Sequence, residues 1–232
     1  MKKPTLRDYT RTNLIFYRVY VFKPENIFYM RNLLIKSLSS RDYSQYVNEA
    51  LERTVRAHLD SEALSGIITR TAMSIIKTIH EGCKVLIIGN GGSASDASHM
   101  AAELVGRFRR NRPPLPAIAL TTDTSLITAI ANDFDYDQVF VRQCAALLKT
   151  GDILIAISTS GNSKNIIEAV RECEKFDSIT KIALTGSPGG ELARIADIPI
   201  RVPSEYTATI QEVHRTIIHI ICDIVDDYYA QK

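Results

Sequence analysis

The spacing of apolar residues in this 232-residue chain changes near Gly82. Between Tyr43 and Glu81, apolar residues recur every three or four positions, which predicts two helices. These positions are Leu51, Val55 and Leu59, followed by Ile67, Ile68, Ala72, Ile75, Ile76 and Ile79. Beyond Gly82 there are five short apolar runs, KVLIIG, PAIAL, DILIAI, KIALTG and IPIRV. Such runs are typical of strands buried on both faces, and the stretches between them are long enough for helices, so βαβ units around a five-stranded parallel sheet are predicted.

The two ends of the chain differ from this pattern. Towards the C-terminus the helical spacing returns and predicts a long final helix. Its apolar positions are Ile210, Val213, Ile217, Ile218, Ile221 and Val225. Near the N-terminus, the stretch TNLIFYRVYVFKPENIFYM is rich in aromatic side chains but is interrupted by Arg18 and Lys23, which makes it a poor signal peptide. We therefore expect one domain over residues 41–232 and an N-terminal extension over residues 1–40 to which no function is assigned.

Composition narrows the class of protein. The formal net charge is +2 and hydrophobic residues make up 45% of the chain, as in an ordinary globular protein, so neither a nucleic acid nor a membrane surface is an expected partner. The four cysteines lie far apart and form no CxxC pair, which favours reduced thiols over a disulfide framework. No apolar run approaches the roughly 20 residues that span a bilayer. We expect a soluble, cytoplasmic protein.

Two loops that follow predicted strands carry the candidate chemistry. The segment GNGGSAS follows the first strand, and STSGNS follows the third. Glycine lets a backbone approach a ligand closely, hydroxyls donate hydrogen bonds, and a helix N-terminus favours an anion. Neither loop contains Lys or Arg, so a phosphate monoester held by neutral donors fits better than a nucleoside triphosphate.

Two other interpretations of these loops compete with the phosphate cradle. Ser, Thr and Asn often do no more than cap a helix, although capping needs one hydroxyl and STSGNS supplies four. Gly89, Gly91 and Ala94 also satisfy the loose dinucleotide pattern G-x-G-x-x-G/A, with Asp123 as a possible ribose-binding acid. A dinucleotide fold, however, gives no role to the second hydroxyl-rich loop.

Histidines and acids on two predicted helices suggest proton transfer or metal binding. His99 and Glu103 lie four residues apart, on one face of the helix that GNGGSAS opens. On the C-terminal helix, Gln211, His214 and His219 interrupt the apolar pattern. Residue spacing alone does not choose between His214 and His219.

The chain resembles the sedoheptulose 7-phosphate isomerases, also called phosphoheptose isomerases, of the sugar-isomerase (SIS) fold. The resemblance starts near Tyr43 and rests on the blocks GNGGSASDASHMAAELVGRF, TAIANDFDYDQVF, GDILIAISTSGNSKNIIEAV, ALTGSPGG and IRVPSEYTATIQEVHRTIIH. It implies a flavodoxin-like three-layer sandwich and an aldose–ketose isomerase that converts sedoheptulose 7-phosphate to D-glycero-D-manno-heptose 7-phosphate through an enediol. It also implies a zinc-binding homotetramer.

The resemblance assigns roles to particular residues. Glu103 and His219 would be the catalytic acid/base couple. Zn²⁺ would be held by His99, Glu103, Gln211 and His219, which favours His219 over His214. The sugar phosphate would contact Asn90, Gly91, Gly92, Ser93, Glu103, Asn132, Asp133, Ser158, Thr159, Ser160, Ser163 and Gln211.

Helix geometry adds an expectation about assembly. Gln211 and His219 are eight residues apart, which is about 12 Å along a straight helix, so one zinc ion does not easily take both from one chain. We therefore expect active sites shared at subunit interfaces, with His219 or its helix contributed by a neighbour.

One alternative function and one group of charges remain. A relative with the same fold, the DnaA initiator-associating protein, is a non-enzymatic regulator, but it lacks the acid and the histidine found here as Glu103 and His219. The basic run after Glu103 is interpreted as solvated surface at Arg109, Arg110 and Arg112, whereas Arg107 matches a family position near the site. Ala208, Thr209 and Ile210 depart from the charged side chains that many relatives carry there.

Overall fold

The computed structural model describes residues 43–231, so the expectations for residues 1–40 lie outside the described residues. The chain divides into two units, residues 1–51 and 52–232, and only residues 43–51 of the first are described. The described part starts with α3 (Tyr43–Asp60), followed by the short 3-10 helix η2 (Ser61–Leu64) and α4 (Ser65–His80). The prediction of two helices ahead of the sheet is confirmed.

All five predicted strands form, and they make one parallel sheet. The strands are β1 (Val85–Gly89), β2 (Ala117–Ala119), β3 (Ile153–Ile157), β4 (Thr180–Thr185) and β5 (Ile198–Arg201). Their order in the sheet is β2-β1-β3-β4-β5, with every neighbouring pair parallel, which is the order of flavodoxin-like folds. β1 and β3 are neighbours, and Gly89 is paired with Ile157. The two polar loops therefore leave the sheet side by side.

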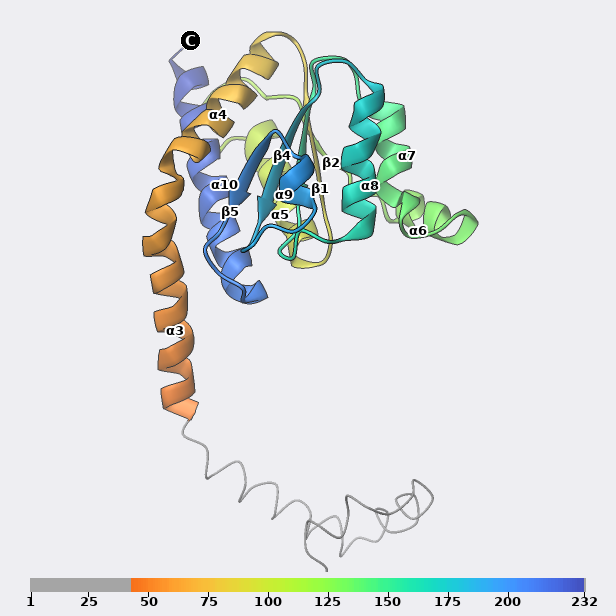
Figure 1. The fold of residues 1–232 in the computed structure, drawn as a ribbon. Helices are drawn as coiled ribbons and strands as arrows, with labels where there is room; N and C mark the ends of the chain where they lie inside the picture. Colours follow the sequence, from red (N-terminus) through yellow and green to blue (C-terminus); the bar gives the residue numbers. More distant parts are fainter. Residues whose placement is uncertain (1–42, 232) are drawn as a thin grey trace, which may run out of the picture. The chain divides into compact units, whose positions relative to one another are not determined.

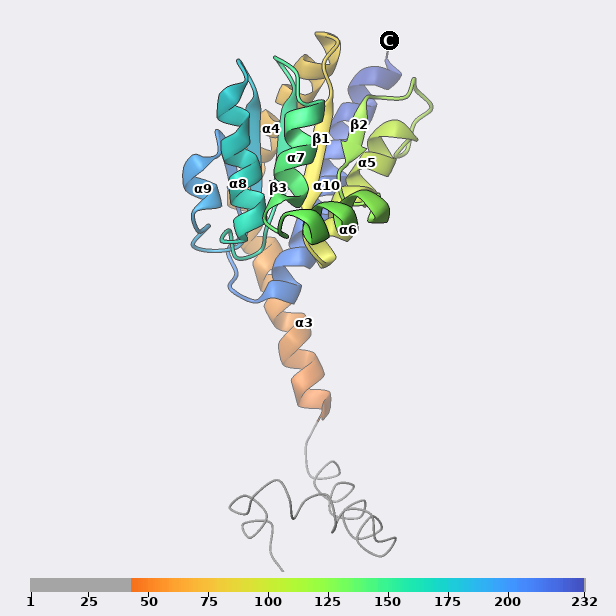
Figure 2. The same ribbon diagram turned by 90° about the vertical axis from the view of Figure 1, so that its right-hand side faces the viewer.

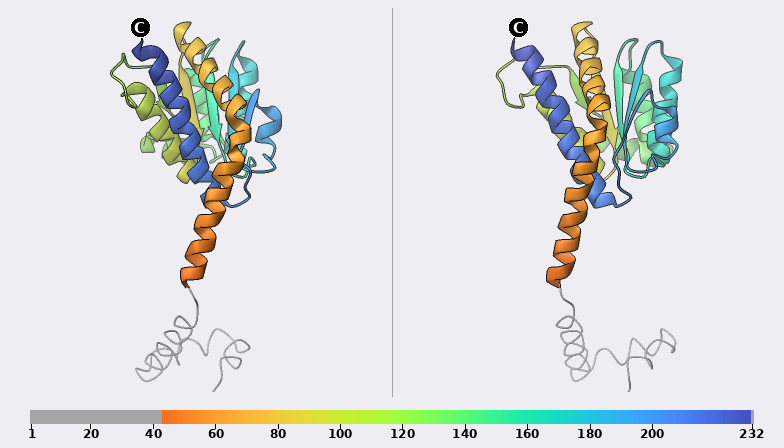
Figure 3. Two further views of the ribbon diagram at one scale, coloured as in Figure 1. Left: turned by 90° about the vertical axis from the view of Figure 1, so that its left-hand side faces the viewer. Right: turned by 60° about the vertical axis from the view of Figure 1, so that its left-hand side comes forward.

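Helices cover both faces of the sheet, as Figures 1 and 2 show, and confirm the three-layer sandwich. One face is covered by α4, α5 (Gly92–Val105) and α10 (Thr207–Ala230), with α4 and α10 side by side in both views of Figure 3. The other face is covered by α6 (Thr124–Asp133), α7 (Gln138–Leu147), α8 (Lys164–Glu172) and α9 (Leu192–Ile195), and η3 (Cys173–Lys175) extends α8.

The strand side chains explain why both faces are covered. Val85, Ile87 and Ile155 point into the core beneath α4, α5 and α10, whereas Leu86 and Leu154 point into the core beneath α7 and α8. Alternate residues of a strand face opposite sides of a sheet, so an unbroken apolar run needs an apolar layer on each side. None of the helices in the described range is both long and apolar enough to cross a membrane.

Two sequence interpretations are corrected by the fold. Asp123 is the N-cap of α6, and its carboxylate accepts a hydrogen bond from the backbone N–H of Leu126 at 2.9 Å, so it has a capping role in place of the ribose-binding one. The interpretation of Arg112 as solvated is wrong, since its side chain is 1% exposed and forms an ion pair with Asp226. All four cysteines are free thiols, and three of them, Cys144, Cys173 and Cys222, are buried.

Candidate active site

The loop after β1 is shaped by two glycines. A Cβ atom at Gly89 would overlap the backbone carbonyl of Ser93, so only glycine allows α5 to turn back so tightly on the strand. Gly91 has a φ of +55°, in the region that favours glycine. At the N-terminus of α5, the N–H groups of Ser93, Ala94 and Ser95 bond to the carbonyl oxygens of Asn90 and Gly91. The helix dipole still favours an anion at the carboxyl end of β1, so this end of α5 suits a phosphate group.

The loop after β3 is the second half of the cradle. Ser158 is buried, and its Oγ lies 3.0 Å from Oγ of Ser163, the N-cap residue of α8. Ser160 Oγ accepts a hydrogen bond from the backbone N–H of Asn162 at 3.1 Å. Gly161 has a φ of +65°, and a Cβ atom there would overlap the carbonyl oxygen of Gly189. Hydroxyls and the N-terminus of α8 thus face the same edge as the first loop.

Asn165 and Tyr136, which were not predicted from the sequence, form hydrogen bonds with Asn90 of the first loop. Asn90 and Asn165 exchange a reciprocal pair of side-chain hydrogen bonds, with nitrogen–oxygen distances of 2.8 and 3.0 Å. The Tyr136 hydroxyl donates to Asn90 Oδ1 at 3.1 Å. Asn165 is buried in the first turn of α8, two residues after STSGNS. This position beside the second loop was the feature of the sequence that could have indicated its role. Asn132 and Asp133, at the end of α6, are exposed and hydrogen bonded to each other at 2.9 Å.

Polar contacts between α5 and α10 occur in layers that advance in the same direction along both helices. In the first layer, the Gln211 side chain lies against Gly92, where a Cβ atom would overlap it. One turn further on, Arg215 Nε donates to Asp96 Oδ1 at 2.8 Å. His99 and His219 form the next layer. The helices therefore run parallel, from the phosphate loops towards the histidines.

The last of these layers holds a cluster of two histidines and one acid. His99 Nε2 lies 2.8 Å from His219 Nε2 and 3.2 Å from Glu103 Oε1. Phe108 stacks on His219 with ring centroids 5.4 Å apart. Burial lowers the pKa of His99, the positive charge of Arg215 lowers it further, and Glu103 opposes both. A His99 imidazole that is neutral near pH 7 can accept a proton or bind a metal.

The cluster fits a zinc ion by the chemistry and spacing of its donors. One ligand atom from each of His99, Glu103 and His219 lies within 4.8 Å of the other two. Two imidazole nitrogens and a carboxylate oxygen are donors that zinc prefers. The side chains of His99 and Glu103 are only 30% and 19% exposed, so the cluster is partly shielded from water.

Comparisons with known proteins place this site in a family. The SIS domain family model matches residues 42–186. The phosphoheptose isomerase of Shewanella sediminis is 50% identical over 184 residues, which is 78% of this chain and 93% of the relative. The chain belongs to the phosphoheptose isomerase family. Two solved phosphoheptose isomerases have similar structures. That of Francisella tularensis is 41% identical with a TM-score of 0.77, and the match covers 81% of this chain and 100% of the solved chain. That of Neisseria gonorrhoeae is 41% identical with a TM-score of 0.75, and the match covers 80% of this chain and 99% of the solved chain.

Within this phosphoheptose isomerase fold, the two histidines left open by residue spacing have different surroundings. His214 is fully buried, with Nε2 3.1 Å from the Thr185 carbonyl oxygen, and lies outside the cluster. His219 lies in it. Gln211 is separated from His219 as the helical spacing predicted, so one chain brings together three of the four predicted zinc ligands. The chain's own His219 supplies the third of them, contrary to the expectation that a neighbour contributes it.

Proposed function

We propose that this chain is an aldose–ketose isomerase that interconverts sedoheptulose 7-phosphate and D-glycero-D-manno-heptose 7-phosphate. The observation that carries the proposal is the cluster of His99, Glu103 and His219, about two helical turns along α5 from a cradle of hydroxyls and helix N-termini. A phosphate anchor and a proton-transfer cluster on one helix fit a phosphosugar isomerase. The curated relatives carry the name of the enzyme, and nothing in the comparisons supports the regulator.

The cradle would hold the phosphate with neutral donors. Ser158, Ser160 and Ser163 would supply hydroxyls, and the N-termini of α5 and α8 would supply favourable helix dipoles. Asn90 Oδ1 accepts from Asn165 and Tyr136, and the amide nitrogen uses one of its two N–H hydrogens on Asn165, so we propose that Asn90 contacts the substrate through its backbone or its remaining side-chain N–H. Thr159, Ser93, Asn132 and Asp133 keep their proposed places in the binding site.

The proton transfers follow from the residues in the cluster. The base takes the proton from C2 of the aldose, the electron pair forms the C1–C2 double bond of the enediol, and the carbonyl oxygen on C1 takes up a proton. The enediol then collapses to the ketose, as the hydroxyl on C2 loses its proton and C1 gains one. We assign these transfers to Glu103 and His219 as the acid/base couple. No external oxidant is needed, because C1 is reduced as C2 is oxidised.

We propose His99, Glu103 and His219 as the ligands of a zinc ion, with the fourth position open to Gln211 of a second copy of the chain. When bound, the ion would supply Lewis-acid polarisation of the substrate carbonyl. Within one chain Gln211 lies in the layer of Gly92, away from the layer of His99 and His219, so its predicted role as a ligand would require a second copy of the chain. Sedimentation of the zinc-loaded protein and of Gln211→Ala would show whether metal binding and assembly are linked.

The function is tested by incubating purified protein with sedoheptulose 7-phosphate and with other ketose phosphates, with and without zinc, and measuring aldose formation. Glu103→Gln is expected to reduce kcat by at least about 100-fold, since positioned acid/base groups contribute factors of that order. His219→Ala should do the same, and both should keep the circular dichroism of the wild type. His80→Gln, at the far end of α4, is the control and should retain activity. Turnover of a different ketose alone would overturn the substrate, and no turnover of any would overturn the enzyme.

A further inference from the structure

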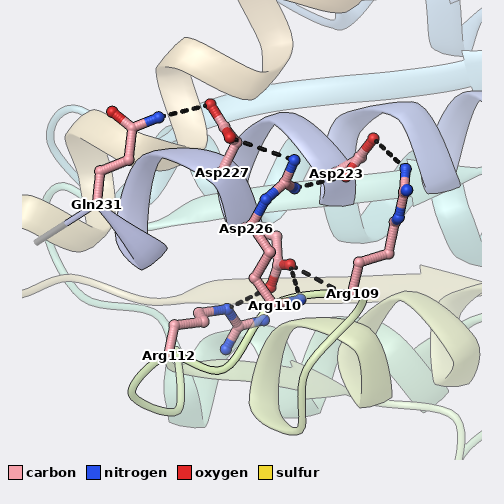
Figure 4. Close-up of polar contacts among 7 residues, drawn as sticks. All are labelled: Arg109, Arg110, Arg112, Asp223, Asp226, Asp227 and Gln231. Carbon is pink, nitrogen blue, oxygen red and sulfur yellow. Dashed lines mark hydrogen bonds and ion pairs between the residues drawn. The ribbon is translucent and has the colours of Figure 1, made fainter.

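A buried carboxylate on α10 organises the loop that follows α5. Asp226 is 0% exposed, and its Oδ2 accepts the backbone N–H groups of Arg109 at 3.1 Å and Arg110 at 2.6 Å. Its Oδ1 accepts Nε of Arg112 at 2.9 Å. Figure 4 shows these bonds meeting at the Asp226 carboxylate. Burial alone would raise the pKa of Asp226, but the two N–H groups and the Arg112 charge outweigh it and lower the pKa, which keeps the carboxylate ionised.

The guanidinium of Arg112 connects this carboxylate to the end of α5. Nη2 donates to the carbonyl oxygen of Glu103 at 2.7 Å, and Nη1 donates to that of Leu104 at 2.8 Å and to that of Pro113 at 2.9 Å. The last carbonyls of a helix lack partners within it, so Arg112 satisfies the C-terminal turn of α5. One of these carbonyls belongs to Glu103, whose side chain is in the cluster.

The segment between these anchors carries the ring that touches His219. Phe108 precedes Arg109, and it lies against the His219 imidazole at an interplanar angle of 28°. The His219 imidazole forms an edge contact with His99 and a stacked contact with Phe108. Phe108 is therefore adjacent in sequence to a backbone N–H that Asp226 holds.

Arg109 and Arg110, unlike Arg112, form ion pairs that are exposed to solvent. Asp223 pairs with Arg109 at 3.4 Å and with Arg110 at 2.8 Å, and these side chains are 36% to 65% exposed. Exposed pairs contribute little to stability. A buried pair such as Arg112 with Asp226 is often no better for stability than apolar residues of the same shape, so stability alone does not explain it.

We infer that Asp226 and Arg112 are positioning residues for the acid/base cluster. They hold the loop after α5 so that Phe108 fixes the His219 ring, and they join the Glu103 end of α5 to the His219 end of α10. The inference rests on the proposed isomerase function for its kinetic consequence, but its structural consequence is independent of it.

The kinetic test compares Asp226→Asn with two matched controls. Asp226→Asn is expected to lower kcat by at least about tenfold, because small misplacements of catalytic groups cost this much or more. KM should stay within about twofold, because the phosphate cradle lies at the other end of α5. Asp223→Asn removes a neighbouring carboxylate that pairs with the same loop and should retain wild-type kcat. Val225→Ala removes buried methyl groups beside Asp226. It serves as a variant with a lowered melting temperature in which the bonds of Asp226 to the loop and to Arg112 are intact.

The outcomes separate positioning from general stability. If Val225→Ala and Asp226→Asn lower the melting temperature alike, only Asp226→Asn should lose kcat at a temperature where both are folded. Equal losses of kcat in the two variants would overturn the inference. Phe108→Leu keeps the bonds of Asp226 and Arg112 and removes the aromatic ring, so it should also lower kcat with little change in KM. A wild-type kcat in this variant would contradict the proposal that the loop acts on His219 through Phe108.

A second measurement reads the geometry without turnover. The ring current of Phe108 should shift the His219 imidazole proton resonances, which would be assigned by comparison with His219→Gln. Phe108→Leu should remove this shift, and Asp226→Asn should reduce it, whereas Asp223→Asn should leave it. An unchanged His219 resonance in Asp226→Asn would overturn the inference even in an active enzyme. Absence of wild-type turnover would overturn only the proposed function, and the resonance would still decide the positioning.

Discussion

Lowering the pH from 7 to 5 is expected to destabilise the fold through His214. This side chain is fully buried on α10, with Nε2 3.1 Å from the carbonyl oxygen of Thr185 and no hydrogen-bond partner for Nδ1. Burial lowers its pKa to about 4, although the Thr185 carbonyl and the charge of Asp96 on α5 act in the opposite direction. A second proton would place an unpaired N–H and a charge in the core.

The sign and size of the effect follow from linkage. In the unfolded chain His214 takes up a proton near its ordinary pKa of about 6.5, but in the folded chain it does so only near 4. The unfolded state therefore binds more protons between these values, and stability falls as the pH falls through that window. The loss attributable to His214 is about 2 kcal/mol between pH 7 and pH 5, and about 3 kcal/mol by pH 4.

The assay is urea unfolding of wild type and His214→Gln at several pH values and one protein concentration. A glutamine amide can donate to Thr185 as the imidazole does, but it does not titrate. The variant should therefore show a shallower fall in the free energy of unfolding, by about 2 kcal/mol at pH 5. The comparison is between two pH dependences, so a uniform loss of stability in the variant does not affect it. Curves that run parallel for the two proteins would refute the reasoning.

Two further predictions concern the phosphate cradle. Gly161→Ala should lower the melting temperature and raise KM, because it places a Cβ at a φ of +65° and against the Gly189 carbonyl, a combination that costs at least about 1 kcal/mol. Thermal unfolding and steady-state kinetics would check both effects. A fully active, equally stable variant would count against this account of the loop. Asn165→Leu removes both amide partners of Asn90, and it should raise KM several-fold more than it lowers kcat; the reverse ratio in steady-state kinetics would contradict a binding role.

The sheet was predictable because its signal is local. Each buried strand of a parallel sheet needs its own run of apolar residues, and the runs from KVLIIG to IPIRV match the five strands, with β4 beginning one residue before its run. The helical spacing of Val55 and Leu59 also predicted α3 correctly, although both side chains are exposed in the described structure. Periodicity indicates the type of element, but it does not show what covers the apolar face.

The site was predictable where neighbours in space are neighbours in sequence. His99 and Glu103 are one turn apart on one helix, and helical geometry alone places them together. The partner of Arg112 is 114 residues away, so no local pattern marks that arginine as buried. The same holds for the choice between His214 and His219, which depends on how α10 is rotated against the sheet and against α5. Only the resemblance to the family favoured His219 in advance.

The parallel packing of α5 and α10 has a consequence for substrate size. Gly92 and His99 mark two of the layers between these helices, and seven residues of helix separate them by about 10 Å. For a substrate anchored by its phosphate at one end of α5, this separation would set the distance from the phosphate to the reacting carbon. A shorter carbon chain would stop before the histidines, and a longer one would carry its carbonyl past them. Chain length would then be selected by the helical rise itself, without a contact dedicated to counting carbons.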